Sequence, residues 1–88
     1  MKAQFIQKGH KIVVDKRLSG IQLIVDEKVC AKETEFFKMQ NTDYDLIGTA
    51  INSDGTTDEV KVAFSHGLFV DTITVYYAGE EIGSANIL

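Results

Sequence analysis

The chain has 88 residues, which is enough for one domain built around one core. Its hydrophobic fraction of 44% is typical of a globular protein and argues against a disordered chain. The formal net charge of −4 argues against a general nucleic-acid binder, because such proteins carry a dense basic face.

The first third of the chain alternates apolar and polar residues with the period of two that is typical of β-strands. Residues that favour tight turns separate the apolar runs, at Gly9, Gly20 and Asp26–Lys28. We therefore expect strands near 3–8, 10–16, 20–26 and 28–34.

The middle of the chain departs from this pattern. The stretch "EKVCAKETEFFKMQN" is rich in helix-forming residues, so it predicts at most one short helical turn near 34–40, with a continued strand as the alternative. The stretch "NTDYDL", residues 41–46, has the composition of a loop.

The second half returns to strand-like alternation. Val60, Val62 and Phe64 fall on one face of a predicted strand, and Asp54-Gly55 just before them is a strong hairpin signal. We expect strands near 46–52, 58–66, 70–78 and 81–88.

The two halves resemble each other. Residues 11–18 align with 61–68 at an offset of fifty, and residues 21–28 align with 73–80 at an offset of fifty-two, which would make Ile82 the counterpart of Cys30. Alternation alone could also produce such matches. We expect an all-β domain, an antiparallel β-sandwich or a small flattened barrel of about 7–8 strands. Residues 1–88 would form this single domain, which could consist of two similar hairpin-based halves.

Cysteine content and hydropathy bear on the location of the protein. The single cysteine, Cys30, permits no disulfide within the chain. No apolar run approaches the ~18 residues of a membrane-spanning helix. The N-terminal "MKAQFIQKGHK" is too polar for a signal peptide. We expect a cytoplasmic protein that binds neither membranes nor nucleic acid.

Charge is unevenly distributed along the chain. Residues 1–38 contain eight Lys and Arg against five acids, a local +3, whereas residues 39–88 contain one Lys against eight acids, a local −7. A mixed solvated surface would explain this pattern. The alternative is a basic and an acidic pole that attract each other between copies of the chain.

The residues that could carry chemistry are few. His10 and His66 each lie beside a turn glycine, where exposed histidines are expected, and Cys30 lacks a nucleophile signature. The acidic stretch around Gly55 lacks the ligands that a calcium loop needs at its first and last positions. We therefore predict no catalytic, cofactor-binding or metal-binding residues. A histidine within reach of a carboxylate or of Cys30 in a cleft would favour an enzyme instead.

The aromatic residues suggest where a partner could bind. We expect Phe64, Phe69 and Tyr77 to fill the core. Tyr76 and Ile24 then face outward by alternation and, with Phe36 and Phe37, form a candidate interaction surface. The two phenylalanines could instead cover the outward pair.

The favoured interpretation is a noncatalytic binding or assembly module that forms a homodimer or binds another protein through a sheet edge or face. One alternative is a small barrel that holds an apolar molecule between its sheets. Another is an enzyme that uses His10, His66 and Cys30. We expect no cofactor.

Overall fold

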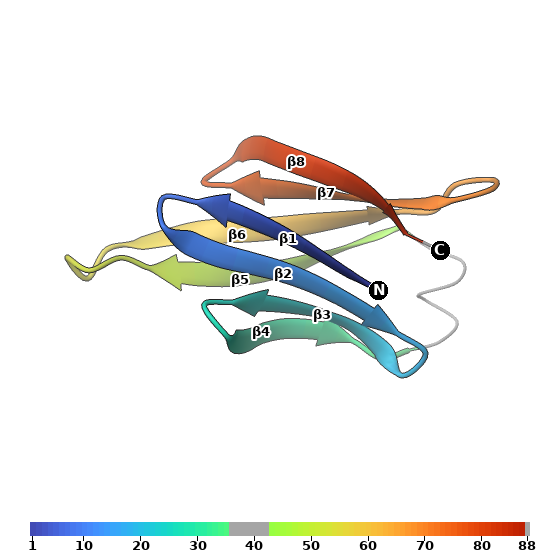
Figure 1. Ribbon diagram of the computed structural model, residues 1–88, viewed down its shortest axis with the longest axis horizontal. Helices are drawn as coiled ribbons and strands as arrows, with labels where there is room; N and C mark the ends of the chain where they lie inside the picture. Colours follow the sequence, from blue (N-terminus) through green and yellow to red (C-terminus); the bar gives the residue numbers. More distant parts are fainter. Residues whose placement is uncertain (36–42, 88) are drawn as a thin grey trace.

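The computed structural model describes residues 1–35 and 43–87, the last of these by its backbone alone. The strands form two four-stranded antiparallel sheets that pack as a β-sandwich (Figure 1). The first sheet contains β1 (Lys2–Gln7), β2 (His10–Arg17), β3 (Gly20–Val25) and β4 (Lys28–Glu33). The second sheet contains β5 (Tyr44–Ile51), β6 (Thr57–Ser65), β7 (Asp71–Tyr77) and β8 (Glu80–Ile87).

The predicted sandwich is confirmed, and every predicted strand end lies within two residues of the observed one. The expected loop at 41–46 was wrong in its second part, because β5 begins at Tyr44. The Tyr44 ring stacks on Phe64 with centroids 4.8 Å apart, so it belongs to the core. The helical turn predicted near 34–40 falls mainly on Phe36 and the residues after it, outside the described residues, and Thr34 and Glu35 are not helical.

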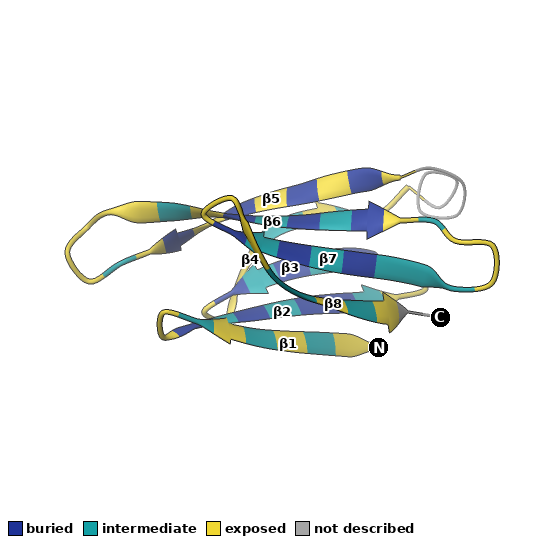
Figure 2. Ribbon diagram, turned by 90° about the horizontal axis from the view of Figure 1, so that it is seen from above, coloured by how far each residue is buried: buried dark blue, intermediate teal, exposed yellow. Residues whose placement is uncertain are grey.

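The core lies between the sheets and consists of buried residues of β2, β3, β5, β6 and β7, with partly buried apolar residues of the edge strands packed against them. Figure 2 shows how buried residues alternate with exposed ones along β5. Val60, Val62 and Phe64 of β6 face this core as predicted, whereas Lys61 and Ala63 between them are only partly buried. Burial of such apolar side chains is the main force that holds the two sheets together. The described residues include no helix of the length and apolarity that a membrane span requires.

Tight turns join β1 to β2, β3 to β4, and β7 to β8. In each turn the two central residues have positive φ, for example 50° and 77° at Lys8-Gly9 and 50° and 85° at Ala78-Gly79. This combination is typical of the type I′ hairpin turn, whose twist matches that of the strands. At Asp26-Glu27 both residues carry side chains, and their φ values are 50° and 70°. That turn is therefore strained and must be held by other contacts.

The two halves share one pairing register, which supports the predicted similarity. Leu23 pairs with Ala31 and Ile24 with Val29, so Cys30 is the extra residue of a β-bulge. Fifty-two residues later the same pattern places Ile82 in the equivalent bulge of β8. The offset of fifty for residues 11–18 was wrong. Ile12 pairs with Val25 as Val60 pairs with Tyr77, so the structural offset of β2 and β6 is 60 − 12 = 48.

Edge strands of the two sheets lie close to each other, β4 to β5 and β1 to β8. A Cβ atom added to Gly48 of β5 would lie 2.7 Å from the Cβ of Cys30 on β4. A Cβ added to Gly83 of β8 would lie 2.7 Å from the Phe5 ring of β1. Glycine at these two positions therefore permits the close edge contact. The hairpin turns after β1, β3, β5 and β7 gather at the end of the sandwich opposite the chain termini (Figure 1).

Candidate functional site

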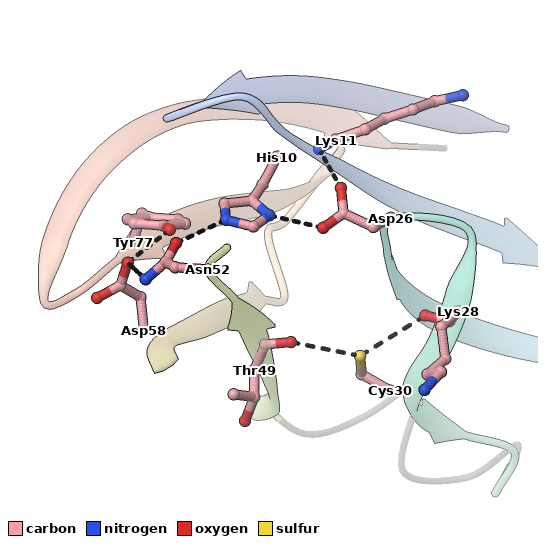
Figure 3. A network of polar contacts seen from close by, with 9 residues as sticks. All are labelled: His10, Lys11, Asp26, Lys28, Cys30, Thr49, Asn52, Asp58 and Tyr77. Atoms are coloured by element: carbon pink, nitrogen blue, oxygen red, sulfur yellow. Dashed lines mark hydrogen bonds and ion pairs between the residues drawn. The ribbon is translucent and has the colours of Figure 1, made fainter. Parts of the chain in front are cut away.

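A network of polar side chains lies at the end of the sandwich where the hairpin turns of both sheets meet. We call it the His10 network, and it consists of His10, Asp26, Asn52, Asp58 and Tyr77 (Figure 3). His10 begins β2, faces the core and is only 8% exposed.

The imidazole of His10 bridges the two sheets. Its Nδ1 lies 2.6 Å from Oδ2 of Asp26, in the turn after β3, and its Nε2 lies 2.8 Å from Oδ1 of Asn52, in the loop after β5. The other Asp26 oxygen accepts a 2.9 Å hydrogen bond from the backbone N–H of Lys11. Asp26 thereby anchors its own strained turn to β2.

Hydrogen-bond donors and acceptors determine the protonation of His10. The Nδ2 of Asn52 lies 3.1 Å from an Asp58 oxygen and 3.0 Å from the hydroxyl of Thr56, whose own proton is donated to Asp54. The Asn52 amide must therefore donate on that side and accept at Oδ1. His10 consequently donates from Nε2 to Asn52 and from Nδ1 to the Asp26 carboxylate. Only the imidazolium form carries both protons.

The pKa values follow this geometry. Hydrogen bonds from His10 to Asp26 and then to Asn52 raise the pKa of His10 above its ordinary value, against the opposing effect of burial. The same bond from His10 and the Lys11 N–H lower the pKa of Asp26. Hydrogen bonds from Tyr77 and Asn52 lower the pKa of Asp58. Burial, followed by the bond to Asp58, raises the pKa of Tyr77 to about 12.

The expectation that both histidines are exposed turn residues was wrong for His10. The residue alternates with the buried Ile12 and Val14 along β2, so the period of the strand directs it inward. This alternation was a usable sequence signal. The partners Asn52 and Tyr77 could not be identified from sequence, because sheet-to-sheet packing brings them to His10.

His66 lies at the opposite end of the sandwich, in the loop after β6. Its backbone N–H donates a 2.7 Å hydrogen bond to Asp43, and its Nδ1 lies 3.1 Å from Oδ1 of Asp71. Lys16 of the first sheet places its Nζ 3.7 Å from the other Asp71 oxygen. This cluster joins the two sheets at the second end.

Cys30 lies apart from both histidines. Its thiol faces the carbonyl oxygens of Lys28, at 3.6 Å, and Thr49, at 4.0 Å, rather than the His10 ring (Figure 3). A surface groove of about 220 Å³ runs beside it, lined by Val25, Asp26, Lys28, Cys30, Thr49 and Ile51.

Both histidines thus contact carboxylates, an arrangement that favours an enzyme when it lies in a cleft. Both ring nitrogens of His10 are occupied by Asp26 and Asn52, however, so this imidazole is not free to accept a proton from a nucleophile. Within residues 1–35 and 43–87, no three His, Cys, Asp or Glu side chains gather in a way that could hold a metal ion. The geometry of the His10 network is that of a structural bridge between the sheets.

Ile24 and Tyr76 of the predicted interaction surface lie on different sides of the sandwich. Ile24 lies between two inward-facing residues of β3, so its side chain is on the outer face of the first sheet. Tyr76 lies between two inward-facing residues of β7, so its side chain is on the outer face of the second sheet. The two side chains therefore belong to separate surfaces. Phe36 and Phe37 lie outside the described residues.

On the outer face of the first sheet, Ile24 lies in an apolar row. Val13 pairs with Ile24, which pairs with Val29, so three adjacent strands each contribute one aliphatic side chain. Val29 is 50% exposed, and Ile6 on the neighbouring strand is 61% exposed. The equivalent positions on the second sheet hold Lys61, Tyr76 and Glu81, and Lys61 lies 4.8 Å from the centre of the Tyr76 ring. The two outer faces therefore differ in chemistry.

The outer faces also differ in charge. Among the strand residues of the first sheet, the outward-facing charged side chains are Lys2, Lys11, Asp15, Arg17 and Lys32, a sum of 4 − 1 = +3. Among those of the second sheet they are Asp45, Glu59, Lys61 and Glu81, a sum of 1 − 3 = −2. We call these surfaces the basic face and the acidic face.

The placement of Phe69 in the core was wrong. It lies in the loop between β6 and β7 and is 91% exposed. Two leucines are exposed to a similar extent, Leu68 beside it at 90% and Leu18 in the β2–β3 turn at 95%. These residues follow the ends of strands, where alternation no longer determines burial.

Comparisons of the chain with protein-family models, with curated proteins and with solved structures find no match.

Proposed function

We propose that this domain is a noncatalytic assembly module that binds copies of itself through an outer face of its sandwich. The observation that carries the proposal is the apolar row of Val13, Ile24 and Val29 on the basic face. With the exposed Ile6 beside it, the row presents aliphatic surface away from the core. Covering such surface is favourable by roughly 25 cal/mol for each Å² removed from water.

A face is a better binding surface here than an edge. At both edges of the sandwich a strand of one sheet lies close to a strand of the other, as the contacts of Gly48 with Cys30 and of Gly83 with Phe5 indicate. Each edge is therefore partly covered within the monomer. The outer faces are broader, and the basic face combines apolar and charged groups as protein interfaces do.

Two observations favour binding over the alternatives. The His10 network uses both ring nitrogens internally, which argues against acid–base catalysis by His10. The inward-facing residues of the central strands, such as Leu23, Ile73 and Val75, are fully buried against one another, which argues against an apolar ligand between the sheets.

The test compares the wild-type chain with Val29→Glu by sedimentation velocity over a range of concentrations. Position 81 holds Glu at the equivalent site of β8, so this strand position accepts the substitution. Ser53→Glu, in the exposed β5–β6 loop, is the matched control because it adds the same charge away from both faces. We expect wild type and Ser53→Glu to associate and Val29→Glu to remain monomeric. Association of Val29→Glu equal to that of the control would contradict the proposal.

A further inference from the structure

We infer that the basic face of one copy binds the acidic face of the next, an inference that rests on the proposed self-association. The two halves of the chain provide the first argument. Lys2 and Asp45 occupy equivalent positions in the shared register, and so do Lys11 and Glu59. At these positions one face presents an ammonium group where the other presents a carboxylate.

The charges of the two faces favour a head-to-tail contact between copies over a symmetric dimer. In a symmetric dimer, basic face on basic face, the lysines of both copies would approach one another. In a head-to-tail contact, Lys2, Lys11 and Lys32 of one copy would meet a surface with a net charge of −2 on the next. Opposed charges of this kind accelerate association and suppress the like-charged pairing.

Apolar groups are available on both sides of this contact. The basic face offers Val13, Ile24 and Val29, and the acidic face offers Tyr76 together with Ile47 and Ile51, which are 54% and 65% exposed. The molecule measures 42 × 21 × 18 Å, so one face is of the same order as the roughly 800 Å² that each partner buries in a standard interface.

Head-to-tail contact has a consequence for the size of the assembly. Because the two binding surfaces are different, each added copy leaves one basic and one acidic face free at the ends. Such a heterologous contact produces an open chain unless its rotation closes a ring. The inferred product is a linear series of copies that grows with concentration and shortens with added salt.

The test reverses each face with the residues that the other half carries at the same positions. One variant combines Lys2→Asp with Lys11→Glu, and the other combines Asp45→Lys with Glu59→Lys. Each variant alone should associate about tenfold or more weakly than wild type at low ionic strength. An equimolar mixture of the two should associate again, because one variant now has two acidic faces and the other has two basic faces.

The possible results separate this inference from the proposed function. If wild type associates but Asp45→Lys with Glu59→Lys associates equally well, or if the mixture stays monomeric, the head-to-tail contact is overturned while self-association stands. If wild type is monomeric at every concentration, the proposed function fails as well. Circular dichroism verifies folding, and Lys2→Asp with Lys32→Glu replaces the first variant if Lys11→Glu disturbs the Lys11–Asp26 contact.

Discussion

His10 and Asn52, from different sheets, are joined by a 2.8 Å hydrogen bond from Nε2 to Oδ1. Asn52 donates both amide protons elsewhere, so this bond requires a proton on Nε2. The second proton of the imidazolium is held by Asp26. A buried cation therefore connects the sandwich at the end where the hairpin turns meet.

Removing His10 should destabilise the fold. His10→Ala leaves Oδ1 of Asn52 and Oδ2 of Asp26 without the donor that His10 provides, although Oδ1 of Asp26 keeps its bond from the Lys11 N–H. Loss of one partner of a buried hydrogen bond costs about 1–3 kcal/mol of the free energy of unfolding. Urea unfolding measures the loss. The control is His66→Ala, which removes a partly exposed side-chain contact with Asp71 and should cost less than about 1 kcal/mol. Equal losses in the two variants would show that His10 does not bridge the sheets as described.

Stability should also depend on pH. The pKa of His10 is raised, so its contribution is complete below the unfolded value of 6.5 and is lost as the pH rises through the higher folded value. Asp26 and Asp58 have lowered pKa values, so their contributions are complete above about 3.8 and are lost as the pH falls through the folded values.

The urea midpoint should therefore be highest between these two limits and should decline on both sides. His10→Ala should remove most of the alkaline decline, while His66→Ala should retain it. A wild-type midpoint that does not fall as the solution is made alkaline, or an NMR titration placing His10 at or below its ordinary pKa, would contradict the imidazolium assignment.

The two edge glycines should differ in their tolerance of a methyl group. In Gly48→Ala the new Cβ would meet the Cβ of Cys30 at 2.7 Å, an atom held by the backbone, and overpacking of this kind costs about 1–3 kcal/mol. In Gly83→Ala the new Cβ would meet Cε2 of the Phe5 ring at 2.7 Å, and this ring can rotate away because it is the end of a side chain. Thermal unfolding should show a larger loss for Gly48→Ala, and Phe5→Leu should reduce the smaller loss at position 83. The reverse order would mean that β4 and β5 are less closely packed than β1 and β8.

Phe64 and Phe69 should respond differently to truncation. Phe64 is 2% exposed and stacks on Tyr44, so Phe64→Ala should cost about 3–5 kcal/mol. Phe69 is 91% exposed, so Phe69→Ala should change the free energy of unfolding by less than about 0.5 kcal/mol. Urea unfolding distinguishes the two, and a large loss at Phe69 would place that ring in the core.

The contrast between these phenylalanines explains what could be predicted from the sequence. Phe64 lies within a strand, where a period of two decides which side chains face the core, and the same rule placed Val60 and Val62 correctly. Phe69 lies in a loop, where no period applies. Ile24 and Tyr76 were correctly directed outward, but whether they share a surface depends on which sheet each strand joins. The alternation of apolar and polar residues carries no information about which sheet a strand joins.

The His10 network was beyond sequence reasoning for a related reason. Asp26 lies 16 residues from His10 in the sequence, and Asn52 lies 42 residues from it. These residues meet because four hairpin turns gather at one end of the sandwich. Hairpin signals at Gly9 and Gly55 predicted the turns. They could not predict that the turns of the two sheets would face each other.

The inferred head-to-tail assembly predicts how the mass of the unmodified chain depends on concentration and salt. Sedimentation velocity at low ionic strength, over increasing concentration, should show an average mass that rises from 9.8 kDa past the dimer without a plateau, and that falls when salt is added. A mass of 9.8 kDa at every concentration would show that the domain does not associate with itself.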